Sequence, residues 1–342
     1  MPELPEVETI VRRLAPLVTG QRLQSFEVRD PRWCAPLAPQ ELLDAVRGRR
    51  VDGLRRRGKY LVWDLEADIH LVMHLRMTGT LLWHPAPASP PPPHTRVVIG
   101  LGAGRMVFVD PRRFGTGTLL LGTPALAAFF ALRLGVEPLQ PAFTAAHLRG
   151  LARGRRAPIK AFLLDQRNLA GVGNIYADEA LFRAGVHPLR PAGSLRPSQY
   201  GLLRDAVVAV LRSGIDARGA SIDDYRDPDG VRGSFQDRFL VHRREGLPCP
   251  VCRRAVRKLV VAGRGTYVCE RCQPRPRPRP RPVGPARPRA GRSGGEQLIQ
   301  APGVGGGDHL GVAADQLLAH DDLGEGHHPG ALDELGPSLR VH

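Results

Sequence analysis

The stretch NLAGVGNIYADEALF, residues 168–182, has the pattern of a helical hairpin closed by a glycine-containing turn. An apolar helix ends near Gln166, Gly171 and Gly173 lie in the turn, and Asn174 is a good N-cap for the next helix. Such a turn gathers free backbone N–H groups at a positive helix end, which suits a phosphate group. A plain helical hairpin without a ligand is the alternative interpretation.

The basic segment before this hairpin, ARGRRAPIK at 152–160, favours the phosphate interpretation. Its side chains would bracket the same nucleic-acid backbone: Arg153, Arg155, Arg156 and Lys160. The 342-residue chain has 49 Lys and Arg against 33 Asp and Glu, a net charge of +16. Residues 273–342 hold eight arginines and eight acids, so the excess lies in residues 1–272. A body of this charge attracts nucleic acid; a merely basic enzyme is the alternative.

Four cysteines have the spacing C-x2-C-x16-C-x2-C: Cys249, Cys252, Cys269 and Cys272. Two close pairs let two turns meet around one tetrahedral ion, and four thiolates close that site against water, so we predict one structural Zn²⁺. Two disulfides or an iron–sulfur centre are the alternatives. The residues between the pairs predict a basic β-hairpin whose tip, 262–265, presents Arg264 to a partner or to solvent. Cys34 is expected to be an ordinary buried thiol.

Residues 1–130 have the pattern of a β-rich domain, sandwich or barrel, that begins with a helix. Residues 5–18 carry an apolar stripe at helical spacing, with Pro5 suited to the first position and Glu6 and Glu8 near the positive end. Strand-like segments follow at 60–65, 70–75, 96–101 and 105–110, with a hairpin turn at 102–104. The proline-rich segment 85–93 is expected to be an exposed loop.

Helical segments follow Leu121 and continue to about residue 215. A Gly- and Asp-rich segment, 216–235, then leads to the cysteines, and loops of this length are functional or mobile. Residues 273–342 are low in complexity and lack a core pattern, so we expect a disordered tail. Its Arg-Pro repeat either holds DNA weakly or belongs to an extension without a fold.

Two further motifs place basic side chains next to strands. In VDPRRFG, residues 109–115, arginine would reach base edges or phosphate and Phe114 would act as a wedge between base steps. A β-turn with Arg112 paired to an acid is the alternative. In RRRGKYLVWDL, residues 55–65, Lys59 stands at a strand entrance, where an ordinary basic surface is the alternative.

The N-terminal sequence MPELPE contains residues that precede its helix and that the helix does not explain. Met before Pro is commonly removed, which leaves Pro2 as a secondary amine, and α-amino groups have a pKa of about 8. Such an amine can attack a sugar C1′ to form an iminium, and Glu3 can move a proton to the opened sugar. We therefore predict that Pro2 and Glu3 react, whereas the helix start accounts for Pro5, Glu6 and Glu8.

Together these motifs resemble the formamidopyrimidine-DNA glycosylase family of bacterial base-excision repair enzymes. The matching stretches span residues 1–272 in the family's order: MPELPEVET, RGKYL, HLRMTG, DPRRFG, GVEPL, GVGNIYADEALF and the cysteine motif. The resemblance implies an α+β, multidomain protein with an N-terminal β-sandwich and flanking helices, a helix–two-turn–helix module and a C-terminal zinc finger. It implies removal of oxidised purines (8-oxoguanine, formamidopyrimidines) from duplex DNA through a Schiff base, and cleavage of the AP site by β,δ-elimination.

The resemblance also implies roles for single residues. Pro2 corresponds to the Schiff-base nucleophile, Glu3 to its proton donor, Lys59 to the proton donor in β-elimination, and Arg264 to the residue linked to δ-elimination. Met77, Arg112 and Phe114 would fill the gap left by the everted base, and Arg112 would also contact the orphaned cytosine. His94, Arg155 and Asn174 match DNA-contact positions, and the loop around 217–234 would cover the base, which must leave the stack before the amine reaches C1′.

Three features depart from the family pattern. Arg76 in HLRMTG stands where the family usually has glycine. Arg155 and Arg156 replace common lysines, which preserves charge but not point-charge geometry. The tail has no counterpart in the resemblance.

We therefore expect a catalytic β-sandwich at 1–130, a linker at 131–150, a DNA-binding helical module with its lesion-covering loop at 151–234, a zinc finger at 235–272 and the tail. Without a signal-peptide pattern or an apolar run of about 20 residues, we expect a cytoplasmic bacterial monomer associated with the nucleoid through damaged double-stranded DNA, and with no membrane. Two rival hypotheses stay open: an endonuclease VIII-like glycosylase for oxidised pyrimidines, and a damaged-DNA-binding protein without catalysis. MPELPE and DPRRFG favour the purine enzyme.

Overall fold

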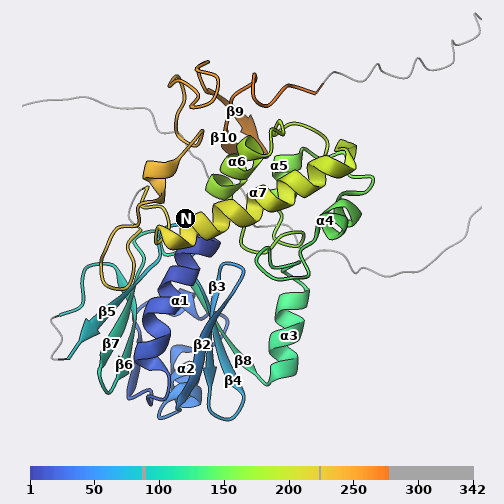
Figure 1. The fold of residues 1–342 in the computed structure, drawn as a ribbon. Coiled ribbons are helices and arrows are strands. Elements are labelled where there is room, and N and C mark those ends of the chain that lie inside the picture. The colour runs from blue at the N-terminus through green and yellow to red at the C-terminus, as the bar shows by residue number, and fades with distance from the viewer. Residues whose placement is uncertain (87–89, 223–224, 277–342) are drawn as a thin grey trace, which may run out of the picture. The chain divides into compact units, whose positions relative to one another are not determined.

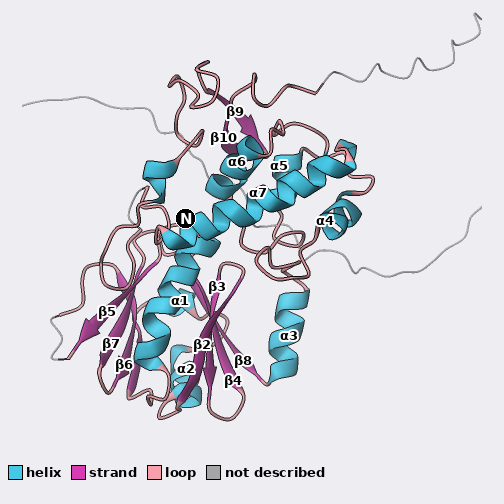
Figure 2. Ribbon diagram, viewed as in Figure 1, coloured by secondary structure: helices cyan, strands magenta, loops and turns pink. Residues whose placement is uncertain are grey.

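The computed structural model describes residues 1–86, 90–222 and 225–276. Two four-stranded antiparallel sheets are followed by a group of helices and then by a two-stranded hairpin (Figures 1 and 2). The α+β organisation expected from the sequence is therefore confirmed. The expected tail lies outside the described residues from residue 277 onward, as do positions 87–89 of the proline-rich segment and 223–224 of the predicted lesion loop.

The two sheets are built around the strands that the sequence predicted. One has the order β2-β3-β4-β8, formed by Val51–Arg57, Tyr60–Leu65, Ile69–His74 and Thr116–Leu121. The other has the order β1-β6-β7-β5, formed by Ser25–Val28, Thr95–Leu101, Gly104–Val109 and Thr80–Pro85. The predicted hairpin turn is confirmed, since Leu101 pairs with Gly104 across β6 and β7.

The four strands that the sequence did not predict, β1, β2, β5 and β8, are the four edges of these sheets. An edge strand is paired on one side only and is more exposed, so its residues carry less of the apolar signal. β2 shows this directly, because its sequence VDGLRRR ends in three arginines. The central strands β3, β4, β6 and β7 have the stronger apolar pattern and were found.

Helix α1, Leu4–Val18, connects the sandwich with the helical module (Figure 1). Its stripe Val7, Ile10, Leu14 and Val18 is fully buried, and the helix packs against β2. Its contacts extend also to α7, Pro197–Asp216. The first helix therefore brings the N-terminus to the boundary between the two parts of the fold.

The remaining helices follow the predicted segments, with one addition. Helix α2 (Pro39–Val46) was not predicted. The predicted helical segments correspond to α3 (Thr123–Ala131), α4 (Ala145–Ala152), α5 (Ile159–Leu164) and α6 (Asn174–Arg183). Short 3₁₀ helices occur at Pro31–Trp33, Ala192–Ser194 and Phe235–Arg238. The segment expected to be a linker thus contains most of α4, whose Leu148 is buried in the core of the helical module. No helix among the described residues is long and apolar enough to cross a membrane.

The sandwich core is organised around Trp33. Its ring centroid lies 6.2 Å from that of Phe26 and 6.3 Å from that of Phe108, and Gly117 of β8 packs against its indole ring. The neighbouring Cys34 is 3% exposed, which confirms the expected buried thiol, and burial raises its pKa.

A first prediction concerns Gly117→Ala. A Cβ at this position would lie 2.2 Å from the Trp33 ring, so we expect a loss of roughly 1–3 kcal/mol in the free energy of unfolding. Gly53→Ala is the matched control in strand β2, because the nearest atom to its Cβ is 3.9 Å away. Chemical denaturation measures both variants, and equal stability of the two would contradict the packing described here.

Candidate active site

The N-terminal residues lie against the glycine turn of the helical module. Pro2 and Glu3 are both buried. The backbone N–H of Leu4 donates to the carbonyl of Gly171 at 3.0 Å, and the N–H of Ile175 donates to Glu3 Oε1 at 3.1 Å. The positive end of α6 therefore binds the carboxylate of Glu3 through the N–H of Ile175.

The two glycines of the turn are required by this close approach. Gly171 has a φ of +92°, and a Cβ there would lie 2.7 Å from the Leu4 side chain. A Cβ at Gly173 would lie 2.2 Å from Glu3 Cδ. The turn is thus shaped around Glu3 and Leu4.

Asn174 is the first residue of α6, and Gly173 occupies the N-cap position, so the predicted N-cap role of Asn174 is wrong. The helix N-terminus instead uses the Glu3 carboxylate. The Asn174 amide donates from Nδ2 to the carbonyl of Gly265 at 3.0 Å. Its Oδ1 is buried and has no hydrogen-bond partner among the described residues. Asn174 therefore joins the turn to the cysteine hairpin.

Glu6 is also part of the site, which corrects its interpretation as a residue of the helix start alone. Glu6 is 1% exposed, and its Oε1 accepts hydrogen bonds from the Tyr176 hydroxyl at 2.7 Å and the Ala220 N–H at 2.8 Å. Its Oε2 accepts from the N–H of Glu3 at 2.8 Å. Burial, and next the charge of Glu3, raise the pKa of Glu6. Glu6 thereby ties α1, α6 and the start of the loop around 217–234 together.

Lys59 lies in the turn between β2 and β3 and is 6% exposed, so it is not part of an ordinary basic surface. Burial lowers the pKa of Lys59, and the charge of Arg264 acts in the same direction. The carboxylates of Glu3 and Glu6 partly oppose this shift. The structure therefore brings Glu3, Glu6 and Arg264 within electrostatic range of Lys59.

The Lys59 turn is held by Glu137 of the GVEPL motif. A Glu137 carboxylate oxygen accepts from the N–H of Gly58 at 2.6 Å, and the same carboxylate pairs with Arg56 at 2.9 Å. Arg56 also pairs with Glu8 of α1 at 2.9 Å, so Glu8 has a structural role beyond the helix dipole. These contacts fix the turn between α1 and the segment that leads into the helical module.

The predicted gap-filling residues lie on two loops joined by Asp110. The Asp110 carboxylate accepts from the Thr78 hydroxyl and, at 2.7 Å, from the N–H of Gly115, which connects the loop of Met77 with that of Phe114. Met77 is half-buried. His94 is exposed on a third loop, and its carbonyl accepts from the Asp110 N–H at 3.0 Å.

Arg112 is exposed, and its guanidinium carbon lies 4.9 Å from the centre of the Phe114 ring, which is 50% exposed. The arginine of this turn that pairs with an acid is Arg113, whose Nε lies 2.6 Å from Asp30 Oδ2. Arg76, at the position where the family usually has glycine, has a φ of +54°. Its left-handed backbone explains why glycine suits the position, and an arginine there costs about 1 kcal/mol.

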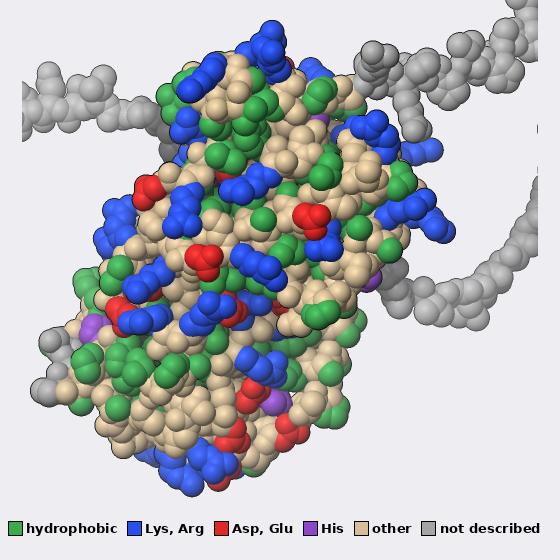
Figure 3. All heavy atoms as spheres, in the orientation of Figure 1, with side chains coloured by type: hydrophobic (Ala, Val, Ile, Leu, Met, Phe, Trp, Pro, Cys, Tyr) green, Lys and Arg blue, Asp and Glu red, His purple; other side chains and the backbone are tan. Residues whose placement is uncertain are grey.

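Within the basic segment at 152–160, Arg153, Arg155 and Arg156 are exposed between α4 and α5, as expected. Lys160 is not: it is 0% exposed, and its Nζ lies 2.7 Å from Asp178 Oδ1. Lys160 belongs to the first turn of α5, which points it into the protein. On the face shown in Figure 3, Lys and Arg side chains are spread from the sandwich to the hairpin end.

The four cysteines that flank the C-terminal hairpin lie close together. Their Sγ atoms all lie within 4.8 Å of one another, with Cys249–Cys272 at 3.8 Å and Cys252–Cys269 at 3.4 Å. Zn–S bonds of about 2.3 Å in a tetrahedron require sulfurs about 3.8 Å apart, so the donor set fits Zn²⁺. Four thiolates leave no position for substrate, which makes the site structural.

The predicted basic hairpin is confirmed as β9, Arg257–Val261, and β10, Arg264–Val268. Its turn is Ala262-Gly263, so Arg264 is the exposed first residue of β10 and pairs with Val261 in the ladder. The finger continues past its expected end at 272, since the buried Gln273 side chain bonds the N–H of Cys269 and the carbonyl of Val186.

Four residues of the site were missed from the sequence. Three of them, Glu6, Glu137 and Asp178, are buried acids. All three occur within the motif stretches of a basic chain, and this position in the sequence could have marked them as candidate site residues. The fourth, His74, pairs across the β3–β4 ladder with Tyr60, the residue that follows Lys59. The His74 ring accepts a hydrogen bond from the Arg76 N–H, and burial lowers the pKa of His74 to about 3. Nothing in its spacing distinguished it from a core residue.

Comparison with known families matches most of the described chain. Residues 1–117 match the formamidopyrimidine-DNA glycosylase N-terminal domain, residues 134–226 the H2TH domain of the same enzymes, and residues 246–275 a zinc finger found in FPG and IleRS. A formamidopyrimidine-DNA glycosylase of Thermus thermophilus is 48% identical over 276 residues, which are 80% of this chain and 98% of that protein.

A second relative extends further. The formamidopyrimidine-DNA glycosylase of Symbiobacterium thermophilum is 43% identical over 308 residues, 88% of this chain and 98% of its own. The match continues beyond residue 276, so the expectation that the tail has no family counterpart is wrong in part. Among solved structures, Lactococcus lactis Fpg in complex with DNA that contains an abasic site has a TM-score of 0.75 at 34% identity, covering 80% of this chain and 100% of that chain.

A second prediction tests the packing of the turn on Glu3. Gly173→Ala should displace the Glu3 carboxylate from the N–H of Ile175 and speed amide hydrogen exchange at Ile175 by about fivefold, since one hydrogen bond is worth about 1 kcal/mol. Gly201→Ala in α7 is the control, because a Cβ there meets nothing within 4 Å. Unchanged exchange in Gly173→Ala would show that the turn does not constrain Glu3.

A third prediction tests the metal centre. Cys249→Ser and Cys269→Ser should each release the zinc and lower the Tm, because the finger has only a small apolar core. Cys34→Ser is the matched control, a buried cysteine that lies outside the cluster. Metal analysis after gel filtration gives the zinc content, and one equivalent of zinc retained in Cys249→Ser would contradict the ligand set.

Proposed function

The chain belongs to the formamidopyrimidine-DNA glycosylase family, and on this premise we propose how its own residues carry out base excision. The protein is a base-excision repair enzyme, a DNA glycosylase with AP lyase activity, and oxidised purines are the lesions that fit its family. The observation that supports the residue assignments is the contact of Glu3 and Leu4, the residues after Pro2, with the glycine turn, together with the electrostatic interaction of Glu3 with the buried Lys59.

We propose that Pro2 is the nucleophile. Once Met1 is removed, the Pro2 nitrogen is a secondary amine whose lone pair can attack C1′ of the everted nucleotide. The C1′–N bond breaks, the damaged base leaves, the sugar ring opens and an iminium joins Pro2 to C1′. The contacts of Leu4 and Glu3 with the turn support this assignment, because they hold the terminus in one place.

Glu3 delivers the proton that ring opening requires. Its Oε1 is held by the Ile175 N–H, whereas its Oε2 is buried and has no hydrogen-bond partner among the described residues. An oxygen of this kind can carry a proton to the sugar O4′ as the ring opens. The helix end that binds Oε1 fixes the direction in which Oε2 points.

Lys59 and Arg264 serve the eliminations. The iminium acidifies the C2′ proton, and its loss expels the phosphate from C3′; a second elimination expels the phosphate from C5′. Burial lowers the pKa of Lys59, so its ammonium gives up a proton more readily than a lysine in water, as the assigned proton donor in β-elimination should. Arg264, exposed at the start of β10 and within range of Lys59, is assigned to δ-elimination.

The DNA is held by residues on both sides of this centre. Met77, Arg112 and Phe114 fill the gap in the duplex, and Asp110 holds their two loops in register. His94, Arg155 and Asn174 contact the DNA backbone. The loop around 217–234 covers the everted base, and its first residues are anchored to the catalytic terminus through Glu6 and Ala220.

Zinc, held by Cys249, Cys252, Cys269 and Cys272, closes the finger and takes no part in the reaction. We also propose that the enzyme works as a monomer in the bacterial cytoplasm, associated with the nucleoid through its substrate. The assembly of all candidate catalytic side chains from one chain supports a monomer. We propose that the chain has three domains: the β-sandwich, the helical module and the zinc finger. Helix α4 belongs to the helical module, because its buried residues lie in that module's core.

A fourth prediction tests the nucleophile. Borohydride reduces an iminium to a stable amine, so the native enzyme should form a covalent adduct with a duplex that contains 8-oxoguanine. Pro2→Gly, or a form that retains Met1, should not form this adduct. The Kd of either form for the lesion duplex should stay within about tenfold of the native value. A duplex with an oxidised pyrimidine measures the rival specificity. Binding without any adduct in the native protein would leave a damage-binding protein, and normal strand cleavage by Pro2→Gly would refute the assignment of Pro2.

A further inference from the structure

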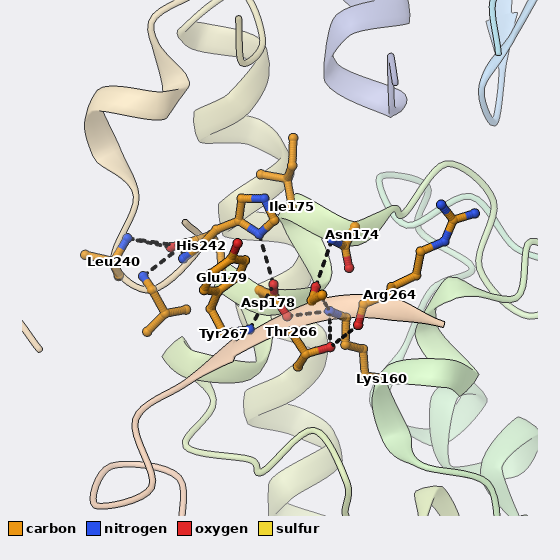
Figure 4. A network of polar contacts seen from close by, with 12 residues as sticks. Lys160, Asn174, Ile175, Asp178, Glu179, Leu240, His242, Arg264, Thr266 and Tyr267 are labelled. Atoms are coloured by element: carbon orange, nitrogen blue, oxygen red, sulfur yellow. Dashed lines mark hydrogen bonds and ion pairs between the residues drawn. The ribbon is translucent and has the colours of Figure 1, made fainter. Parts of the chain in front are cut away.

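The basic hairpin of β9 and β10 is joined to the helical module by a buried polar network (Figure 4). Lys160 of α5 is at its centre: besides its ion pair with Asp178, its Nζ donates to the Thr266 hydroxyl at 2.7 Å and to the Gly265 carbonyl at 3.1 Å. Thr266 is 0% exposed, and its hydroxyl donates to the Arg264 carbonyl at 3.0 Å. Three side-chain groups therefore act on the backbone of Arg264 and Gly265, the third being the amide of Asn174.

Asp178 extends this network to the far end of the hairpin. Its Oδ2 lies 2.9 Å from His242 Nδ1 and accepts, at 3.4 Å, from the N–H of Tyr267. The next residue of α6, Glu179, accepts from the N–H groups of Leu240, Val241 and His242 at 2.9–3.1 Å. Two adjacent acids of one helix thus hold the chain entering the finger and the strand leaving its turn.

Arg264 lies within electrostatic range of two buried lysines. Its charge opposes the ammonium of both Lys59 and Lys160. Like charges at short range in a partly buried site repel one another. The carbonyl contacts described above fix the backbone from which the Arg264 side chain extends, and so limit where that side chain can lie relative to these lysines.

We propose that Lys160 and Thr266 are positioning residues for Arg264: by holding the Arg264 and Gly265 carbonyls they set the place from which Arg264 acts in δ-elimination. The inference rests on the proposed function of Arg264. Docking of the finger alone does not require this arrangement, because an apolar contact would cost less than a buried ion pair with three further hydrogen bonds. The network instead ties two consecutive carbonyls of β10 to side chains of α5, α6 and β10 itself.

A fifth prediction follows for the products of the lyase. Thr266→Val keeps the shape of the side chain but removes the hydroxyl, so the ratio of β,δ- to β-elimination product should fall about tenfold or more, since a shift near 1 Å can cost up to about a hundredfold in rate. Thr266→Ser keeps the hydroxyl and should retain the native ratio. Asp178→Asn, which removes the charge that holds Lys160, should lower the ratio as well. Gel electrophoresis of a cleaved AP-site duplex separates the two products.

Arg264→Gln is the reference variant, and borohydride trapping, zinc content and Tm are measured for each protein. Loss of δ-product in Thr266→Val with native trapping and zinc supports the inference. A native ratio in Thr266→Val, when Arg264→Gln loses the δ-product, overturns the positioning role and leaves that of Arg264 intact. A native ratio in Arg264→Gln refutes the assigned role of Arg264. A parallel loss of trapping, zinc and δ-product in both Thr266→Val and Asp178→Asn overturns the inference in favour of a structural role.

Discussion

The contact on which the rest of the structure depends is the binding of the Glu3 carboxylate to the first turn of α6. A helix N-terminus attracts an anion, and here the anion belongs to the same chain, one residue from the candidate nucleophile. The contact excludes a side chain at Gly173, requires Leu4 to pair with Gly171 and draws α1 to the boundary between sandwich and helices. An enzyme whose nucleophile is its own terminus needs such a device, because a chain end without tertiary contacts is poorly ordered.

The site also concentrates charge in a place where charge is expensive. Glu3, Glu6 and Lys59 are nearly inaccessible, and burial opposes the charged forms of Glu6 and Lys59, as their pKa directions show. The hydrogen bonds to Glu6 and the mutual attraction of unlike charges offset part of this cost. The same burial moves the pKa of Glu6 up and that of Lys59 down, as is common for groups at functional sites.

An element of the fold could be predicted where its local sequence has a clear pattern of buried apolar residues. The central strands β3, β4, β6 and β7 were found because both neighbours cover them, whereas their four edge partners were missed. The cysteine spacing specified a tetrahedral site directly, since chain length limits how two pairs can meet. Basic residues were less predictable: Arg153, Arg155 and Lys160 look alike in sequence, but only Lys160 lies on the inner side of α5 and pairs with Asp178. Likewise Arg112 and Arg113 are neighbours, and only the second meets an acid.

The sequence by itself determined the candidate inventory of the site: a proline amine with an adjacent acid, a lysine at a strand entrance, the loops predicted to fill the gap in the duplex, and four cysteines spaced for zinc. These features are local, because each depends on residue type and short-range spacing. Only the tertiary structure decided that the Glu3 carboxylate binds the first turn of α6, that Glu6 and Glu137 hold the turns of the candidate site, and that Lys160 faces Thr266. Each of these contacts joins residues 79 or more positions apart, and the fate of a charge depends on which distant partner folding places beside it.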